Sequence, residues 1–324
     1  DIRAAVTIGH VGISNAMIDA LPELGCIVCF GVGVDGIDLA YAKQRGVVVS
    51  HGRDINHEDV ADVAIGLIIA RLRLFTEGEK VLRGGTWTPI SWNEAARQVA
   101  SLALSLKEMG LHPGDRVMLV SENRPEWCIA DLGIMAAGCI SVPTYTTNGE
   151  RDHQHIIEDS GASAVIVSTT KLAQAVMPAA IRATKARHMI AIEDIRVGQE
   201  TGVVLHDWKK LVSRADADVA ACTAQAATYK REDTACIIYT SGTGGAPRGV
   251  KQHHGAILLN VEGCVEIISE DFGWGDEVFL SFLPLSHAYE HSGGQFLPIG
   301  LGGQIYYAEG LEKLATNIEE TRPT

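Results

Sequence analysis

The sequence predicts an α/β fold made of two incomplete pieces that meet near Trp87. In the first piece, short apolar segments alternate with helical patterns, an order that is typical of parallel strands connected by helices. A second series of the same kind begins with a helix start signal at Ser91. It leads to a glycine-rich stretch, residues 240–249, directly after the apolar run 235–239. We therefore expect two domains, residues 1–87 and 88–324, both α/β.

The first piece is predicted to be a flavodoxin-like parallel βα segment. Its expected strands and helices alternate as strand 4–8, helix 14–21, strand 26–30, helix 38–45 and strand 47–50. A longer helix then begins at Asn56, with Glu58 and Asp59 in its first turn. Its apolar residues recur at helical spacing and are Val60, Val63, Leu67, Ala70 and Leu74. We expect that stripe to pack on a sheet or on another domain.

The second piece begins with the capping box Ser91-Trp-Asn-Glu94, and the helix that follows should end at Gly110. Pro125 and Gly138 should bound the next helix. The expected strands are 116–121, 139–142, 164–168 and 189–192. After the glycine-rich stretch, we expect a helix near 256–268 and strands at 278–283 and 304–307.

Composition excludes several classes of protein. The chain has 27 Lys and Arg against 40 Asp and Glu, so its net charge of −13 argues against a nucleic-acid partner. No uninterrupted apolar run reaches the roughly 18 residues that a membrane span needs. The seven cysteines lie mostly within apolar runs, which favours reduced thiols and a cytoplasmic location. The sequence carries no signal for an oligomeric state.

The histidine clusters predict no metal site. His253 and His254 have no carboxylate or cysteine at ligand spacing, so a solvated turn is the preferred interpretation. His153 and His155 lie in the run Asp152-His-Gln-His155, for which we expect an exposed helix start.

The glycine-rich stretch reads Thr240-Ser-Gly-Thr-Gly-Gly-Ala-Pro-Arg-Gly249. Glycines let successive backbone amides converge on anionic oxygens, hydroxyls donate hydrogen bonds, and Arg248 adds positive charge. The alternative is a plain turn between strands. We predict a polyphosphate site, and its candidate residues are Thr240, Ser241, Gly242, Thr243, Gly244, Gly245, Arg248 and Gly249.

This stretch resembles the phosphate loop of the adenylate-forming enzymes, with Gly244 where that family usually has threonine and Arg248 where it has lysine. Other stretches resemble the long-chain acyl-CoA synthetases: Ser121-Glu-Asn-Arg-Pro-Glu-Trp127, Val142-Pro-Thr-Tyr145 and Phe282-Leu-Pro-Leu-Ser-His-Ala-Tyr-Glu290. The resemblance implies the first part of the family's large N-terminal domain. It also implies ATP-dependent activation of a fatty acid, with Mg²⁺ and CoA, and peripheral contact with a membrane.

By the same resemblance, Ser286 and His287 would border the acyl pocket, with His287 near the fatty acid carboxylate. The alternative is a histidine that caps or packs at a strand end. The family's adenine pocket, ribose-binding acid, hinge and C-terminal domain with its lysine are not matched. We therefore expect weak ATP binding at best, and no complete thioester synthesis.

The segment Gly31-Val-Gly-Val-Asp-Gly36 matches the dinucleotide pattern G-x-G-x-x-G. The helix 38–45 is too short for that role and the next strand ends without an acid, so we do not expect NAD binding. Residues 1–87 instead resemble the N-terminal part of the D-2-hydroxyacid dehydrogenases. There Val32, Gly33 and Asp35 would belong to the loop that holds the substrate carboxylate. That family's catalytic Arg, Glu and His are not matched, so no hydride transfer is expected.

Two alternatives to an acid-activating ligase stay open. One is a dehydrogenase fragment, which requires NADH binding. The other is a non-functional fusion of two truncated genes, which should expose apolar faces and aggregate.

Overall fold

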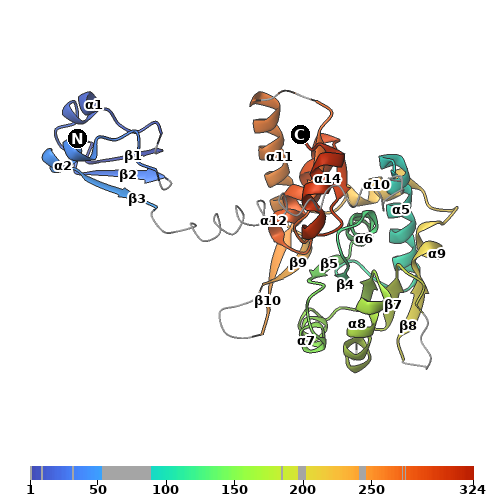
Figure 1. Cartoon of the computed structure of the whole chain (residues 1–324). Coiled ribbons are helices and arrows are strands. Elements are labelled where there is room, and N and C mark those ends of the chain that lie inside the picture. Colours follow the sequence, from blue (N-terminus) through green and yellow to red (C-terminus); the bar gives the residue numbers. More distant parts are fainter. Residues whose placement is uncertain are drawn as a thin grey trace. The chain divides into compact units, whose positions relative to one another are not determined.

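A computed structural model describes residues 2–8, 10–30, 33–52, 89–183, 185–195, 202–240, 246–271, 273 and 275–324 (Figure 1). The chain divides into two compact units, Asp1–Phe75 and Thr76–Thr324. The expected junction near Trp87 and the expected helix that begins at Asn56 lie outside the described residues. The boundary between residues 87 and 88 therefore stays a prediction.

The first unit contains a three-stranded parallel sheet in the order β1 (Ala4–Ile8), β2 (Cys26–Phe30) and β3 (Val48–His51). Helices α1 (Asn15–Asp19) and α2 (Leu39–Gln44) connect the strands. Each helix begins after a side chain that accepts a backbone hydrogen bond from its first turn. The buried core of this unit is Ile13, Ile18, Leu24, Ile27, Cys29, Ile37, Ala42 and Val47. These elements confirm the predicted parallel βα order.

The other face of this small sheet is apolar and exposed in the part of the unit that the structure describes. Val6 is 76% exposed, Phe30 81% and Val48 64%. Parallel sheets are normally covered on both faces. The described residues of the first unit therefore supply only one of the two layers that such a sheet needs.

The second unit is organised around a seven-stranded sheet in the order β10-β9-β5-β4-β6-β7-β8. Neighbouring strands are parallel except β9 and β10, which are antiparallel. The strands are β4 (Arg116–Val120), β5 (Ile140–Thr144), β6 (Ala164–Val167), β7 (His188–Ala191), β8 (Val204–Asp207), β9 (Thr234–Thr240) and β10 (Arg248–His253). The strands that follow β4 in the sequence lie on both of its sides, with β5 on one side and β6 on the other. The strand order therefore reverses at β4. Ligands of such sheets bind beside this point, at the carboxyl ends of the strands.

Helices cover both faces of the large sheet (Figure 1). The helices on one face are α7 (Glu150–Ser160) and α8 (Thr170–Arg182). Those on the other face are α5 (Trp92–Glu108), α6 (Pro125–Ala136) and α9 (Trp208–Val212), with α10 (Val219–Ala226) against α5 and α6. Because both faces are covered, the central strands are almost entirely buried.

The predicted helix boundaries of the second piece are confirmed. Ser91 Oγ accepts a hydrogen bond from the Glu94 amide at 3.2 Å, which starts α5. Gly110 and Gly138 have φ angles of +87° and +79°, so each ends its helix in the left-handed region.

The remaining elements form a second layer that includes a two-stranded parallel sheet of β11 (Val278–Ser281) and β12 (Gln304–Tyr307). The helices of this layer are α11 (His254–Asp271), α12 (Ala288–Glu290), the π-helix η1 (His291–Phe296), α13 (Leu297–Leu301), the 3₁₀ turn η2 (Leu311–Lys313) and α14 (Leu314–Thr321). Trp92 Nε1 donates to the Gly303 carbonyl at 3.2 Å and thereby joins α5 to this layer.

The expectation of an exposed helix start at residues 152–155 is wrong for His153. This residue is 0% exposed. Helical spacing places it beside Ile156 and Ile157, which face the sheet. Burial lowers the pKa of His153 below its ordinary value, so the neutral ring packs in the core.

Replacing Gly133 with alanine should destabilise the second unit. A Cβ atom at residue 133 would lie 2.7 Å from Leu102 Cδ2, where α6 packs on α5. Overpacking of a core costs about 1–3 kcal/mol, and the better helix propensity of alanine offsets about 1 kcal/mol at most. In contrast, a Cβ at Gly263 of α11 meets no atom within 4 Å, so Gly263→Ala should stabilise the chain.

Urea unfolding followed by circular dichroism would measure both variants. Equal effects of Gly133→Ala and Gly263→Ala would contradict the close contact between α5 and α6.

Candidate functional site

One predicted site segment, the glycine-rich stretch, begins at the same edge of the large sheet as a segment that resembles the acyl-CoA synthetases. The segment 121–123 follows β4, and β9 ends at Thr240. Only β5 lies between β4 and β9. At the usual strand spacing of about 4.8 Å, the two carboxyl ends are therefore about 10 Å apart.

The glycine-rich stretch connects β9 to β10 as a hairpin. Thr240 pairs with Arg248, and Tyr239 pairs with Gly249. A Cβ atom at residue 249 would lie 2.8 Å from Ile237 Cγ2 and 3.0 Å from Tyr239 Cζ, so packing requires glycine there. The predicted residues that lie outside the described part are Ser241, Gly242, Thr243, Gly244 and Gly245.

The two faces of this hairpin differ, because side chains alternate across a strand. Tyr239 belongs to the core under α7, whereas Ile238 belongs to the core that contacts α6 and α11. Thr240 continues the Ile238 side, and its partner Arg248 lies on the same face. Arg248 is exposed and makes no ion pair within the described part of the chain. Its guanidinium can therefore bind an anion at the hairpin.

Asn123 links the large sheet to the segment that contains His287. Its Nδ2 donates to the Leu283 carbonyl at 2.6 Å and to Ser281 Oγ at 3.1 Å. Its Oδ1 accepts from the Leu285 amide at 3.0 Å. Two stretches that the sequence presents separately are thus joined at the end of β4. Sequence reasoning did not single out Asn123, although an amide side chain directly after a strand is a usable signal.

Glu290 forms hydrogen bonds to the start of the same segment, at Ser281 and Phe282. Its carboxylate accepts from Ser281 Oγ at 2.7 Å and from the Phe282 amide at 3.0 Å. The side chain is buried, and burial raises the pKa of Glu290 above its ordinary value.

His287 is the helix cap of α12. Its Nδ1 accepts a hydrogen bond from the Tyr289 amide at 3.2 Å, as the capping alternative expects. An acceptor at Nδ1 leaves the proton of the neutral ring on Nε2. The side chain is exposed, and Nε2 has no hydrogen-bond partner among the described residues. The cap therefore orients a free N–H donor, and the proposed contact with a carboxylate stays a prediction.

A buried polar cluster lies behind this segment. Asp131 Oδ2 accepts from His291 Nε2 and from Gln295 Nε2, both at 2.8 Å. Cys236 Sγ lies 3.9 Å from His291 Nδ1. The order of thiol, imidazole and carboxylate is that of a nucleophilic triad. However, all these groups are fully buried and burial raises the pKa of Cys236 above its ordinary value, so the cluster ties β9 and α6 to η1 instead.

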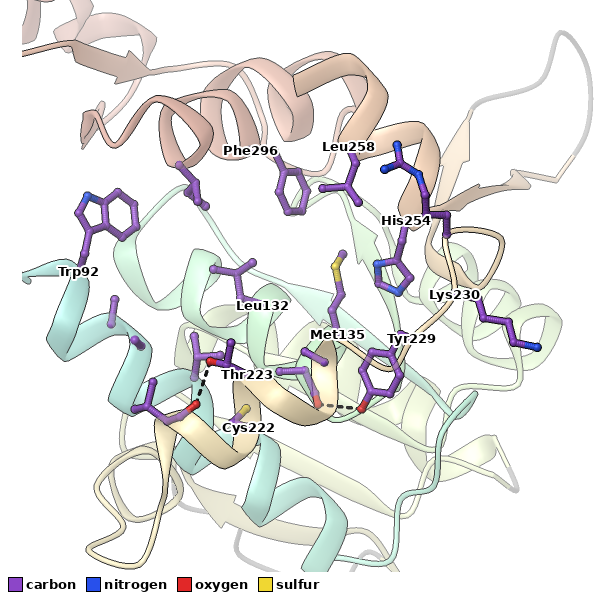
Figure 2. A pocket seen from close by; sticks show the side chains of 18 residues that line it. Trp92, Leu132, Met135, Cys222, Thr223, Tyr229, Lys230, His254, Leu258 and Phe296 are labelled. Carbon is purple, nitrogen blue, oxygen red and sulfur yellow. Dashed lines mark hydrogen bonds between the residues drawn. The ribbon is translucent and has the colours of Figure 1, made fainter. Parts of the chain in front are cut away.

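An apolar cavity of about 460 Å³ lies between α5, α6, α10, α11 and α13 (Figure 2). Its lining includes Trp92, Leu132, Met135, Tyr229, His254 and Phe296. Tyr229 precedes β9, so this cavity lies at the amino end of that strand, about 20 Å along it from the glycine-rich stretch. Neither Ser286 nor His287 lines the cavity. It is therefore a separate feature from the carboxyl-edge site.

The dehydrogenase-like loop of the first unit is described only in part. Gly31 and Val32 lie outside the described residues. Gly33 and Asp35 follow β2 and are exposed, with Asp35 Oδ2 3.3 Å from the position of a Cβ at Gly33. Their role in holding a carboxylate stays a prediction.

No group of three or more His, Cys, Asp or Glu residues in the described part of the chain could hold a metal ion. No helix there is long and apolar enough to cross a membrane.

The family described as AMP-binding enzyme matches residues 74–324. Among curated proteins, long-chain-fatty-acid--CoA ligase FadD15 of Mycobacterium tuberculosis is 32% identical over 204 residues, which are 63% of this chain and 32% of that protein. Long chain acyl-CoA synthetase 7, peroxisomal, of Arabidopsis thaliana is 30% identical over 256 residues, 76% of this chain and 35% of that protein. The chain thus spans about a third of the length of these relatives.

Solved structures show the same fold. A benzoate CoA ligase from Burkholderia xenovorans has a TM-score of 0.58 at 23% identity, with 80% of this chain and 48% of that chain covered. The anthranilate CoA ligase AuaEII in complex with anthranoyl-AMP has a TM-score of 0.59 at 20% identity, with the same coverage. These structures confirm the α/β fold class, and the family match and the curated relatives confirm the predicted resemblance to acyl-CoA synthetases. The resemblance of residues 1–87 to dehydrogenases stays a prediction.

Replacing Asn123 with alanine should release the segment 282–287 from the end of β4. The variant loses three hydrogen bonds, each of which contributes about 0.5–1.5 kcal/mol. Hydrogen exchange at the Leu285 amide should become faster, whereas exchange in β6 should not change. Unaltered protection of Leu285 would contradict the anchoring role of Asn123.

The pH dependence of stability should report the burial of Glu290. Because the folded pKa is raised, this group contributes stability that is complete below the unfolded value of about 4.5 and is lost as pH rises through the folded pKa. The unfolding free energy of the wild type relative to Glu290→Gln should therefore fall as pH rises above about 4.5. Urea unfolding at several pH values measures this difference. A difference that grows with pH would contradict the raised pKa.

Proposed function

Because this chain belongs to the AMP-binding enzyme family, we propose that it binds ATP at residues 240–249 and takes part in activating a fatty acid. The hairpin carries the proposal. Thr240 and the exposed Arg248 lie on one face of it, beside a stretch rich in glycine and hydroxyl residues. Such a stretch can offer amides, hydroxyls and one cation to the β- and γ-phosphates. The names of the two curated relatives support a fatty acid as the substrate.

In the proposed reaction, a carboxylate oxygen of the fatty acid attacks the α-phosphorus of ATP. The bond to the β-phosphate breaks, pyrophosphate leaves, and an acyl-adenylate forms. The thiol of CoA, after losing its proton, then attacks the acyl carbon and AMP leaves. Such a step depends on neutralising charge more than on a protein base. Arg248 would bind the polyphosphate, and His287 Nε2–H would orient the carboxylate.

We expect Mg²⁺ to bind together with ATP rather than at a site of its own. Mg²⁺ is commonly held by one or two carboxylates together with substrate phosphates, and no described cluster could hold it independently. When bound, Mg²⁺ would neutralise the phosphate charge. Arg248 and the hydroxyls of the stretch would hold the phosphates in place beside it.

The proposal also covers the first unit and the cellular location of the protein. We expect residues 1–87 to form part of a substrate-binding domain like that of the D-2-hydroxyacid dehydrogenases, without hydride transfer. We expect the protein to act in the cytoplasm, with peripheral contact with a membrane, because its proposed substrate is a membrane-soluble acid.

ATP titration of the full chain tests the proposed site. Arg248→Ala should raise the dissociation constant about tenfold or more, because a charge-assisted hydrogen bond contributes about 1.5–3 kcal/mol. Lys251→Ala removes the same charge from an exposed residue on the same strand and should have a much smaller effect. Isothermal calorimetry measures both variants. No ATP binding by the wild type, or equal losses in the two variants, would overturn the proposed site.

A further inference from the structure

One histidine of the run 152–155 contacts the hairpin rather than the core. His155 lies on α7 and is half-buried, and its Nε2 lies 2.9 Å from the Pro247 carbonyl oxygen. A carbonyl oxygen only accepts, so Nε2 carries the proton in this contact. A protonated ring would also donate from Nε2, so the hydrogen bond holds in both charge states. Pro247 is directly followed by Arg248, the cation of the proposed phosphate site.

The surroundings of His155 fix its ring in this position. The ring of Tyr239 meets it edge to face, with centroids 6.4 Å apart at 87°. Tyr239 OH in turn donates to Asp159 Oδ2 at 2.6 Å, one helical turn further along α7. Gly249 lies opposite Tyr239, and because it has no side chain the Tyr239 ring can pack close to its backbone. The outgoing limb of the hairpin thus lies against both β9 and α7.

This contact has no equivalent in the described part of the chain. Side-chain hydrogen bonds to residues 246–249 from outside the hairpin come there from His155 alone. Backbone pairing fixes Thr240 to Arg248. The hydrogen bond at Pro247 adds a second support directly before Arg248.

His155 contributes little to the packing of α7. The residues of this helix that are buried against the sheet are His153, Ile156 and Ile157. A change at residue 155 should therefore leave the helix in place and alter the hairpin alone.

We propose that His155 is a positioning residue for the phosphate-binding hairpin. By donating to the Pro247 carbonyl, it holds the outgoing limb so that Arg248 faces the bound polyphosphate. This inference rests on the proposed ATP site and names a residue of α7 as part of its support.

The test compares three variants of the full chain. His155→Leu removes the donor, and His155→Gln places an amide N–H near the former position of Nε2. Gln154→Leu is the matched control, because Gln154 lies on the same helix and binds Glu158 at 2.9 Å instead of the hairpin. Hydrogen exchange of residues 246–250 without ligand and ATP titration by calorimetry are the two measurements. Thermal unfolding shows that each variant is folded.

We expect His155→Leu to speed exchange in residues 246–250 and to raise the ATP dissociation constant about tenfold, or about 1.4 kcal/mol. His155→Gln should restore most of both properties, and Gln154→Leu should match the wild type. Failure of the wild type to bind ATP would defeat the proposed function, while the exchange measurement would still test the contact. ATP binding or exchange unchanged in a folded His155→Leu chain would overturn the positioning role.

Discussion

Burial of the large parallel sheet on both faces is the constraint on which the candidate site depends. Parallel strands all point the same way, so every loop after a strand emerges at one edge. β4 and β9 are two places apart in the strand order, although more than a hundred residues separate them in the sequence. The sheet therefore brings Asn123 and Thr240 to one edge. Helices on both faces keep the strands in register and leave that edge as the place where polar groups collect.

The strands and helices that could be predicted are those whose own residues encode burial. Runs such as those of β4 and β6 are apolar throughout, because both faces of the strand are covered. β10 and β8 were not predicted. β10 is mostly exposed and polar, and it is a strand because β9 supplies its hydrogen bonds. The sequence of a single segment does not indicate which strand it will pair with. The same limit explains His153, whose burial depends on the sheet beneath α7.

The composition of the site could be predicted, but the support around it could not. The glycine-rich stretch and the segment with His287 are visible as local motifs, because the chemistry requires several residues of fixed type close together. Asn123 meets Leu283 across 160 residues of sequence, and His155 meets Pro247 across 92. These contacts depend on strand order. The cluster of Cys236, His291 and Asp131 shows the converse, because residue types alone suggest a nucleophile that complete burial excludes.

Side chains alternate along β9 and β10, so the two faces of the hairpin carry different residues and make different contacts. On the α7 face, Tyr239 and Gly249 pack closely, and His155 holds the backbone at Pro247. On the opposite face, Thr240 and Arg248 stay exposed on the side of α6 and α11. A guanidinium is a planar fork of donors in fixed geometry, so it loses less freedom per hydrogen bond than a flexible ammonium does. In the proposed site, the contact of His155 with Pro247 would place the backbone from which this fork of donors extends.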